Sequence, residues 1–198
     1  MILNRFEFLA MNNPLRAMIQ RRFEARRFLR MGGSESAGHA LEIGCGRGVG
    51  AEIIFDEFSA ATVDAFDLDP KMVELAGKRL ESRGDRLRLW VGDATDIQAP
   101  DSAYDTVFDF GIIQHIPDWR KAIAEVFRVL KPGGRFYAEE VFRAFIFYPL
   151  WRRLLDHPLT DRFDHDEFKS SLRRVGFAVT ADNSLWNAFG WYIADKET

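Results

Sequence analysis

The chain has 198 residues, 47% of them hydrophobic, and a net charge of −3, which suits one domain with an apolar core and gives no overall basic field for nucleic acid. Its single cysteine, Cys45, excludes an internal disulfide and a zinc site built from several cysteines, and no metal site is predicted. It has neither a run of about 18 apolar residues nor the apolar core of a signal peptide, so we expect a soluble, cytoplasmic protein.

Residues 1–33 differ in character from the main predicted domain at 34–198. They carry seven arginines against two glutamates. An Asn-Pro start and a Gly-Gly stop predict a helix from Pro14 to about Met31, with an apolar stripe on one side and arginines around the rest. This helical extension has three interpretations: a helix packed on the domain, a lid over a pocket, or a helix that lies on a membrane surface.

The stretch from Ala40 to Gly48 predicts a short strand that passes through Glu42 into a glycine loop, followed by a helix from Val49 to Phe58. The glycines stand at alternate positions: Gly44, Gly46, Gly48 and Gly50. They allow backbone to pass close to a ligand, and the N–H groups at a helix start suit an anion. A dinucleotide fingerprint would need glycine in place of Val49. A tight turn without a ligand is the alternative.

A second strand is predicted over 61–67 and ends in Asp67. This aspartate lies about twenty residues beyond the loop, the separation at which a carboxylate can accept from both ribose hydroxyls of a nucleoside. Leu68 would then pack on one adenine face. Asp69, followed by proline, is typical of the cap of the next helix. A third strand over 87–91 leads into a Gly-Asp-Ala turn.

A fourth strand is predicted over 104–110, and it runs into the segment 111–119. A helix begins near Asp118 and ends at the Lys-Pro-Gly-Gly run, 131–134, before a fifth strand that starts at Arg135. The later elements predicted are a helix over 164–174 and strands over 178–185 and 189–194, the last of them antiparallel.

Five motifs in this order resemble class I S-adenosylmethionine (SAM)-dependent methyltransferases. They are E-x-G-x-G-x-G at 42–48, Asp67, G-D-A at 92–94, the segment 111–119 after its strand, and L-K-P-G-G at 130–134. The resemblance covers about residues 39–142. It is closest to the small-molecule methyltransferases, the group that also contains the ubiquinone/menaquinone C-methyltransferases.

The resemblance implies an α/β fold: a Rossmann-like seven-stranded sheet in the order 3-2-1-4-5-7-6, with the last strand antiparallel and helices on both faces. It implies SAM as cofactor and S-adenosylhomocysteine as product. Asp93 would receive the adenine amino group, and the Ala94 N–H would donate to the ring, although an ordinary turn aspartate is the alternative. The cofactor-binding residues predicted are Glu42, Gly44, Cys45, Gly46, Gly48, Asp67, Leu68, Asp93, Ala94 and Asp109.

Methyl transfer from a sulfonium is an in-line displacement that needs alignment more than a catalytic group, and a base helps only where the acceptor loses a proton. The candidates are Asp109, His115 and Glu140. Asp109 stands where relatives more often carry a small polar residue, and Gln114 replaces the first histidine of the family's H-H-x-x-D-like segment. Glu140 matches a carboxylate of the C-methyltransferases. Structural roles for His115 and Glu140 are the alternatives.

The segment 142–155 contains five aromatic residues and three arginines. In the family that it resembles, this connection often covers the substrate pocket, so we expect a hydrophobic or aromatic acceptor there. The substrate contacts predicted are Phe142, Arg143, Tyr148 and Trp151. Burial against the basic N-terminal helix is the alternative, and contact with a membrane is a third interpretation.

Two other classes of function stay open: aminopropyl transfer on the same fold, and a non-catalytic binding module. The intact glycine loop and both strand-end aspartates argue against the module. The partner expected is a small molecule rather than nucleic acid, with peripheral membrane contact left open, and the chain is expected to be a monomer or a homodimer. His165, near a helix start, is interpreted as a surface residue.

Overall fold

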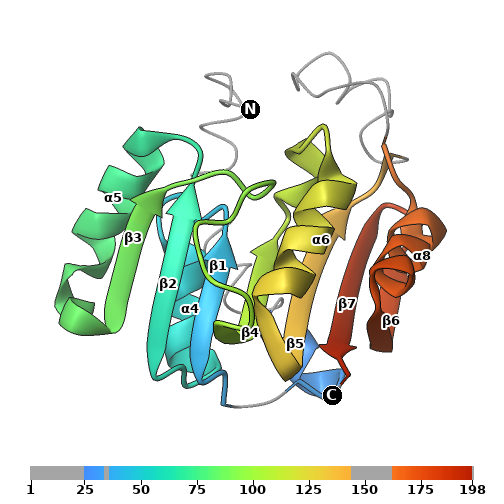
Figure 1. Ribbon diagram of the computed structural model, residues 1–198, viewed down its shortest axis with the longest axis horizontal. Coiled ribbons are helices and arrows are strands. Elements are labelled where there is room, and N and C mark those ends of the chain that lie inside the picture. The colour runs from blue at the N-terminus through green and yellow to red at the C-terminus, as the bar shows by residue number, and fades with distance from the viewer. Residues whose placement is uncertain (1–24, 34–35, 144–161, 198) are drawn as a thin grey trace.

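The computed structural model describes residues 25–33, 36–143 and 162–197, and a single seven-stranded sheet forms its centre (Figure 1). The strands lie in the order β3-β2-β1-β4-β5-β7-β6, which confirms the predicted order. Their bounds are β1 His39–Ile43, β2 Thr62–Asp67, β3 Leu87–Val91, β4 Tyr104–Phe110, β5 Leu130–Val141, β6 Phe177–Leu185 and β7 Phe189–Lys196.

Strands β1 to β5 run parallel, and β7 runs antiparallel to both of its neighbours, β5 and β6. The strand order reverses between β1 and β4, which pair from Ala40↔Thr106 to Ile43↔Asp109. In open α/β sheets, ligands bind beyond the carboxyl ends of the strands at such a reversal. The glycine loop and the end of the fourth strand therefore meet at the expected binding edge.

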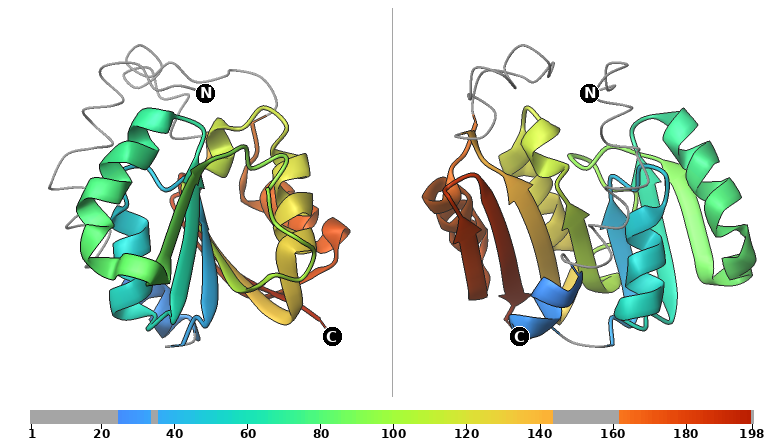
Figure 2. Two further views of the ribbon diagram at one scale, coloured as in Figure 1. Left: turned by 60° about the vertical axis from the view of Figure 1, so that its left-hand side comes forward. Right: turned by 180° about the vertical axis from the view of Figure 1, so that it is seen from behind.

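Helices cover both faces of the sheet, as Figure 2 shows from the side. Helices α3, α4 and α5 pack on one face over a core that includes Phe58 and Tyr137. Helices α6 and α8 cover the other face over a core that includes Trp119 and Tyr192. No helix in the described ranges is long and apolar enough to cross a membrane. The helices are α3 Ala25–Arg30, α4 Val49–Glu57, α5 Pro70–Leu80, α6 Trp119–Val129 and α8 His165–Val175, with short 3-10 helices η2 Glu81–Arg86 and η3 Ile113–His115.

The helix starts are built from the capping residues that the sequence displays. Asp69 caps α5, with proline in the first helical position, and Asp118 caps α6. Asp164 and Glu167 form a reciprocal capping box at the start of α8. Each cap satisfies backbone N–H groups that have no partner inside the helix. These contacts confirm the predicted starts of the three helices.

The predicted start of the fifth strand is wrong. Strand β5 begins at Leu130 rather than Arg135, directly after α6 ends, and the Lys-Pro-Gly-Gly run lies within it. The run forms an irregularity, because β5 goes from Leu130 to Arg135 while its partner β4 goes only from Tyr104 to Thr106. Gly133 has a φ of +77°, which lets the backbone turn there without leaving the sheet.

The described end of the predicted N-terminal extension is helix α3. Phe28 is fully buried and its ring centroid lies 5.4 Å from that of Tyr137 in β5. Arg27 lies over the ring of Trp191 at 3.7 Å. These contacts fit the packed-helix interpretation for this part of the chain. Residues 14–24 of the predicted helix lie outside the described residues. The lid interpretation and the domain boundary at 33 stay predictions.

Candidate functional site

The glycine loop leaves β1 where the strand order reverses, and its three central glycines all have positive φ. The φ values of Gly44, Gly46 and Gly48 are +71°, +49° and +79°. A Cβ on Gly44 would lie 2.5 Å from the side chain of Ile112, and one on Gly48 would lie 2.8 Å from Leu80. A Cβ on Gly46 would meet nothing within 4 Å. Gly46 therefore faces open space at the carboxyl edge of the sheet, as a loop that cradles a ligand requires.

Asp67 ends β2 and ties this strand to the glycine loop. Its two carboxylate oxygens accept the N–H of Gly46 and the N–H of Asp69, each at 2.9 Å. A carboxylate oxygen has two lone pairs, so each can still accept from a hydroxyl. Burial raises the pKa of Asp67, and the two backbone hydrogen bonds offset part of that rise. Leu68 follows with 48% of its surface exposed. The nucleoside contacts of both residues stay a prediction.

Asp93 and Ala94 lie in the loop after β3. Asp93 accepts from the backbone N–H and the hydroxyl of Thr95 at 2.8 and 2.9 Å, so it stabilises the turn in which it lies. Ala94 is buried in the core. The turn role that was left open for Asp93 is therefore present, and its adenine contact stays a prediction.

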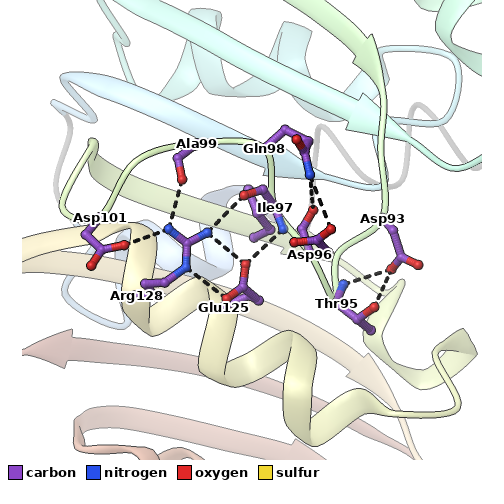
Figure 3. A network of polar contacts seen from close by, with 9 residues as sticks. All are labelled: Asp93, Thr95, Asp96, Ile97, Gln98, Ala99, Asp101, Glu125 and Arg128. Carbon is purple, nitrogen blue, oxygen red and sulfur yellow. Dashed lines mark hydrogen bonds and ion pairs between the residues drawn. The ribbon is translucent and has the colours of Figure 1, made fainter.

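Two residues of α6 hold this loop in place (Figure 3). Arg128 donates to the carbonyl oxygens of Ala99 at 2.8 Å and Ile97 at 2.9 Å, and it forms an ion pair with Asp101. Glu125 accepts the N–H of Ile97 at 2.9 Å. Sequence reasoning missed this clamp, since an arginine in a helix carries no signal that names its distant partners.

Arg128→Met should destabilise the protein by about 2 to 4 kcal/mol, because loop carbonyls and carboxylates lose a charged donor. Urea unfolding measures this loss. Arg79→Met is the matched control: Arg79 pairs with Glu52 at the surface, and its loss should cost less than about 1 kcal/mol. Equal losses for the two variants would contradict the clamp.

Glu42 lies in β1 beneath the first turn of α4 and is only 2% exposed. Its carboxyl accepts the N–H of Ala51, and a Cβ on Gly50 would overlap its Oε1. Burial raises the pKa of Glu42 well above its usual range, and the charges of Asp67 and Asp109 raise it further. Its Oε2 has no hydrogen-bond partner within the described part of the chain. The unused oxygen beside the loop can accept a hydrogen bond from a ligand.

Gly50→Ala should destabilise the protein by about 2 kcal/mol or more, because the added methyl group would displace the buried Glu42 carboxyl. Gly77→Ala is the matched helix-glycine control, since a Cβ there meets only Leu89 at 3.8 Å. That variant should stabilise α5 by about 0.5 kcal/mol. Thermal unfolding of both variants compares the two sites, and a stable Gly50→Ala protein would show that Glu42 lies elsewhere.

Asp109 of β4 and Glu140 of β5 are both fully buried, and they lie on the same face of the sheet, because Asp109 pairs with Ala138 and Glu140 lies two residues further along β5. Asp109 Oδ1 accepts the N–H of Ile112 at 2.8 Å, and Glu140 Oε2 accepts the N–H of Gln114 at 3.3 Å. Burial raises the pKa of Asp109 to about 6. Burial and the Asp109 charge raise the pKa of Glu140 well above its usual range. The pair holds the turn after β4, and His115 lies partly exposed at the end of that turn, in η3.

The described substrate candidates both have structural partners. Phe142 is fully buried and packs against Phe163 and Tyr192. Arg143 forms ion pairs with Asp164 and Glu167, the capping residues of α8. Their predicted substrate contacts stay untested. The other two candidates, Tyr148 and Trp151, lie outside the described residues.

The interpretation of His165 as a surface residue is wrong, since its side chain is only 19% exposed. His165 Nδ1 lies 2.8 Å from the hydroxyl of Tyr192, and Nε2 lies 3.1 Å from the carboxylate of Asp182. Burial and the charge of Glu140 raise the pKa of Tyr192. The array joins α8, β6 and β7, whose side-chain contacts have no local sequence signal.

Comparisons with known proteins agree with this geometry. Residues 41–138 match the methyltransferase domain family. The chain is 40% identical over 96 residues to phosphoethanolamine N-methyltransferase 2 of Caenorhabditis elegans, a match that covers 48% of this chain and 22% of that protein. It is 35% identical over 101 residues to demethylmenaquinone methyltransferase of Thermus thermophilus, covering 50% and 46%. The chain thus spans less than half the length of these curated relatives.

Solved structures share the fold. One is a chain in a complex between a methyltransferase activator and a methyltransferase of Haloferax volcanii, with a TM-score of 0.77 and 19% identity over 100% of both chains. At this identity the similarity shows the fold alone. The sequence matches at 41–138 cover the glycine loop, Asp67, Asp93 and Asp109, and end just before Glu140.

Proposed function

Because the chain belongs to the class I SAM-dependent methyltransferases, we propose that it transfers the methyl group of SAM to a small hydrophobic or aromatic acceptor by in-line displacement. The observation that carries the proposal is the pairing of Gly46 and Asp67. An open glycine donates its N–H to a strand-end carboxylate that keeps lone pairs free for hydroxyls. This arrangement lies beyond the strand ends, next to the reversal of strand order.

The described residues fit SAM part by part. Asp67 would accept from the ribose hydroxyls, Leu68 would cover the adenine, and Asp93 would receive its amino group. The glycine loop would lie along the methionine part. Glu42, whose Oε2 has no hydrogen-bond partner within the described residues, would accept a hydrogen bond from the bound cofactor. When bound, SAM supplies an activated methyl group, and the chain supplies alignment and a site that excludes water.

The apolar character of the acceptor is supported by exposed side chains at the same edge. The large hydrophobic side chains most exposed within the described ranges are Leu68, Val91 and Trp186, the last at 84%. They follow β2, end β3 and follow β6, three strands whose carboxyl ends share one edge of the sheet. The aromatic segment 142–155 is joined to β5 at this edge. The two curated relatives are named for different acceptors, so the acceptor class rests on these residues.

The proposal is tested with the full chain and SAM labelled with tritium in the methyl group. A naphthol, a quinol and a fatty acid serve as apolar acceptors, and phosphoethanolamine serves as the polar comparison. Label should enter an apolar product, and Asp67→Ala should lower the rate. Transfer only to phosphoethanolamine would contradict the acceptor class, and failure to bind SAM would contradict the function itself.

A further inference from the structure

The Asp109–Glu140 pair lies close to the glycine loop, with Ile112 between the two. Asp109 pairs in register with Ile43, the residue that precedes the loop. Asp109 also accepts the N–H of Ile112, and the side chain of Ile112 lies against Gly44. The pair therefore stands beneath the point where β1 and β4 diverge, which is the centre of the proposed cofactor site.

The position of the pair favours one shared proton. Asp109 Oδ1 and Glu140 Oε2 each accept a backbone N–H. The remaining oxygens, Asp109 Oδ2 and Glu140 Oε1, have no hydrogen-bond partner among the described residues. Asp109 pairs with Ala138, and Glu140 lies two residues further along β5, so both side chains lie on the same face of the sheet. Two neighbouring carboxyls that are both fully buried cannot both be ionised without a large cost, so we expect the pair to hold one shared proton.

The surroundings of the pair favour its protonated form as long as no cationic ligand is bound. Both side chains are fully buried, and the neighbouring acids add negative potential. Loss of the proton would leave two negative charges in contact in a site of low dielectric. The titratable groups whose charges act on the pair are Glu42 from β1, Glu139 from β5 and Tyr192 from β7, and Tyr192 in turn contacts His165 of α8.

We propose that the Asp109–Glu140 pair is a proton store that responds to the charge on the cofactor's sulfur, an inference that rests on the proposed function. The pair gives up its shared proton when the sulfonium of SAM binds, and it takes up a proton when the sulfur becomes a neutral thioether. In a turnover, the acceptor's electron pair forms the bond to the methyl carbon. The carbon–sulfur electron pair stays on sulfur, and the acceptor's proton passes to the carboxyl pair.

The test compares SAM with S-adenosylhomocysteine, which differ in the charge on sulfur and the methyl group. Calorimetric titration of the full chain in buffers of different ionisation enthalpy counts the protons released on binding. SAM should release more protons than S-adenosylhomocysteine around pH 6 to 7. The affinity ratio of the two ligands should therefore rise with pH, by up to about tenfold per pH unit for one released proton.

Two isosteric variants identify the source of the protons. Glu140→Gln and Asp109→Asn keep a donor between the two groups through their amide N–H, so the fold should survive while the shared carboxyl proton is lost. In both variants the two ligands should release equal numbers of protons. Glu139 precedes Glu140 in β5, and its side chain lies on the other face of the sheet. Glu139→Gln should therefore keep the difference between the numbers of protons that the two ligands release.

Equal proton counts for the two ligands in the unmodified chain would overturn the proton store. A difference that survives in both Glu140→Gln and Asp109→Asn would also overturn it, because the protons would then come from other groups. If SAM binds but both ligands release equal numbers of protons, the proposed function still stands. The absence of heat with either ligand would overturn the proposed function and this inference together.

Discussion

A Gly46→Val protein is expected to fold and to bind no SAM. A Cβ at this position meets nothing within 4 Å, so the branched side chain would project into the open space proposed for the methionine part of the cofactor. The φ of +49° adds strain of about 1 to 2 kcal/mol for a residue with a Cβ, which a folded domain can tolerate. Far-UV circular dichroism reports the fold, and calorimetry reports the binding.

Gly32→Val is the matched control. Gly32 also has a positive φ, +99°, and a Cβ there also meets nothing within 4 Å. It lies in the turn after α3, away from the glycine loop, so the variant should carry a similar strain and keep its affinity for SAM. Unchanged SAM binding by Gly46→Val would place the cofactor elsewhere. Loss of folding would support the interpretation of the loop as a turn without a ligand.

Asp67→Ala should weaken SAM binding by at least about tenfold. The variant loses the proposed acceptor of two ribose hydroxyls, and hydrogen bonds to a charged group are typically worth about 1.5 to 3 kcal/mol each. It also leaves the N–H groups of Gly46 and Asp69 without their carboxylate, so the loop loses its tie to β2. The dissociation constant for SAM, measured by calorimetry, reports the combined effect.

Two further variants separate these contributions. Asp67→Asn keeps one oxygen acceptor but loses the charge, so its affinity should fall between those of the unmodified chain and Asp67→Ala. Asp101→Ala removes a carboxylate that is 78% exposed and pairs with Arg128, and it should leave SAM binding unchanged. An unchanged dissociation constant in Asp67→Ala would remove Asp67 from the site.

The glycine loop, the strand that ends in Asp67 and the helix caps could be predicted from sequence because their signals are local. The glycine loop, Asp67 and the caps at Asp69 and Asp118 are short patterns whose physical meaning does not depend on distant partners. The structure places them together at one edge because parallel strands end there. The resemblance to a known family supplied the order of the strands.

The acidic groups behind the site were less predictable. The sequence marks Glu42, Asp109 and Glu140 as candidates but cannot show that all three are buried, or that two of them lie close together on one face of the sheet. These properties depend on register between strands, as in Ile43↔Asp109, and on the small size of Gly50 above Glu42. Burial then sets the direction of their pKa shifts.

The start of β5 could not be predicted for a related reason. Lys-Pro-Gly-Gly is typical of a helix stop followed by a turn, and the helix does end just before it. The run stays in the sheet because Leu130 already pairs with Tyr104 and the extra residues are taken up as an irregularity in one strand. Only the pairing of β5 with β4 shows that the Lys-Pro-Gly-Gly run belongs to the strand.

Equilibrium dialysis of the full chain against radiolabelled SAM measures directly whether the chain holds the proposed cofactor. We expect one saturable site per chain, with label displaced by unlabelled S-adenosylhomocysteine and not by NAD⁺, whose fingerprint the glycine loop lacks at Val49. Dialysis with Gly46→Val should show no retained label, and Gly32→Val should match the unmodified chain. Retention of no label by the unmodified chain, or equal displacement by NAD⁺, would contradict the account.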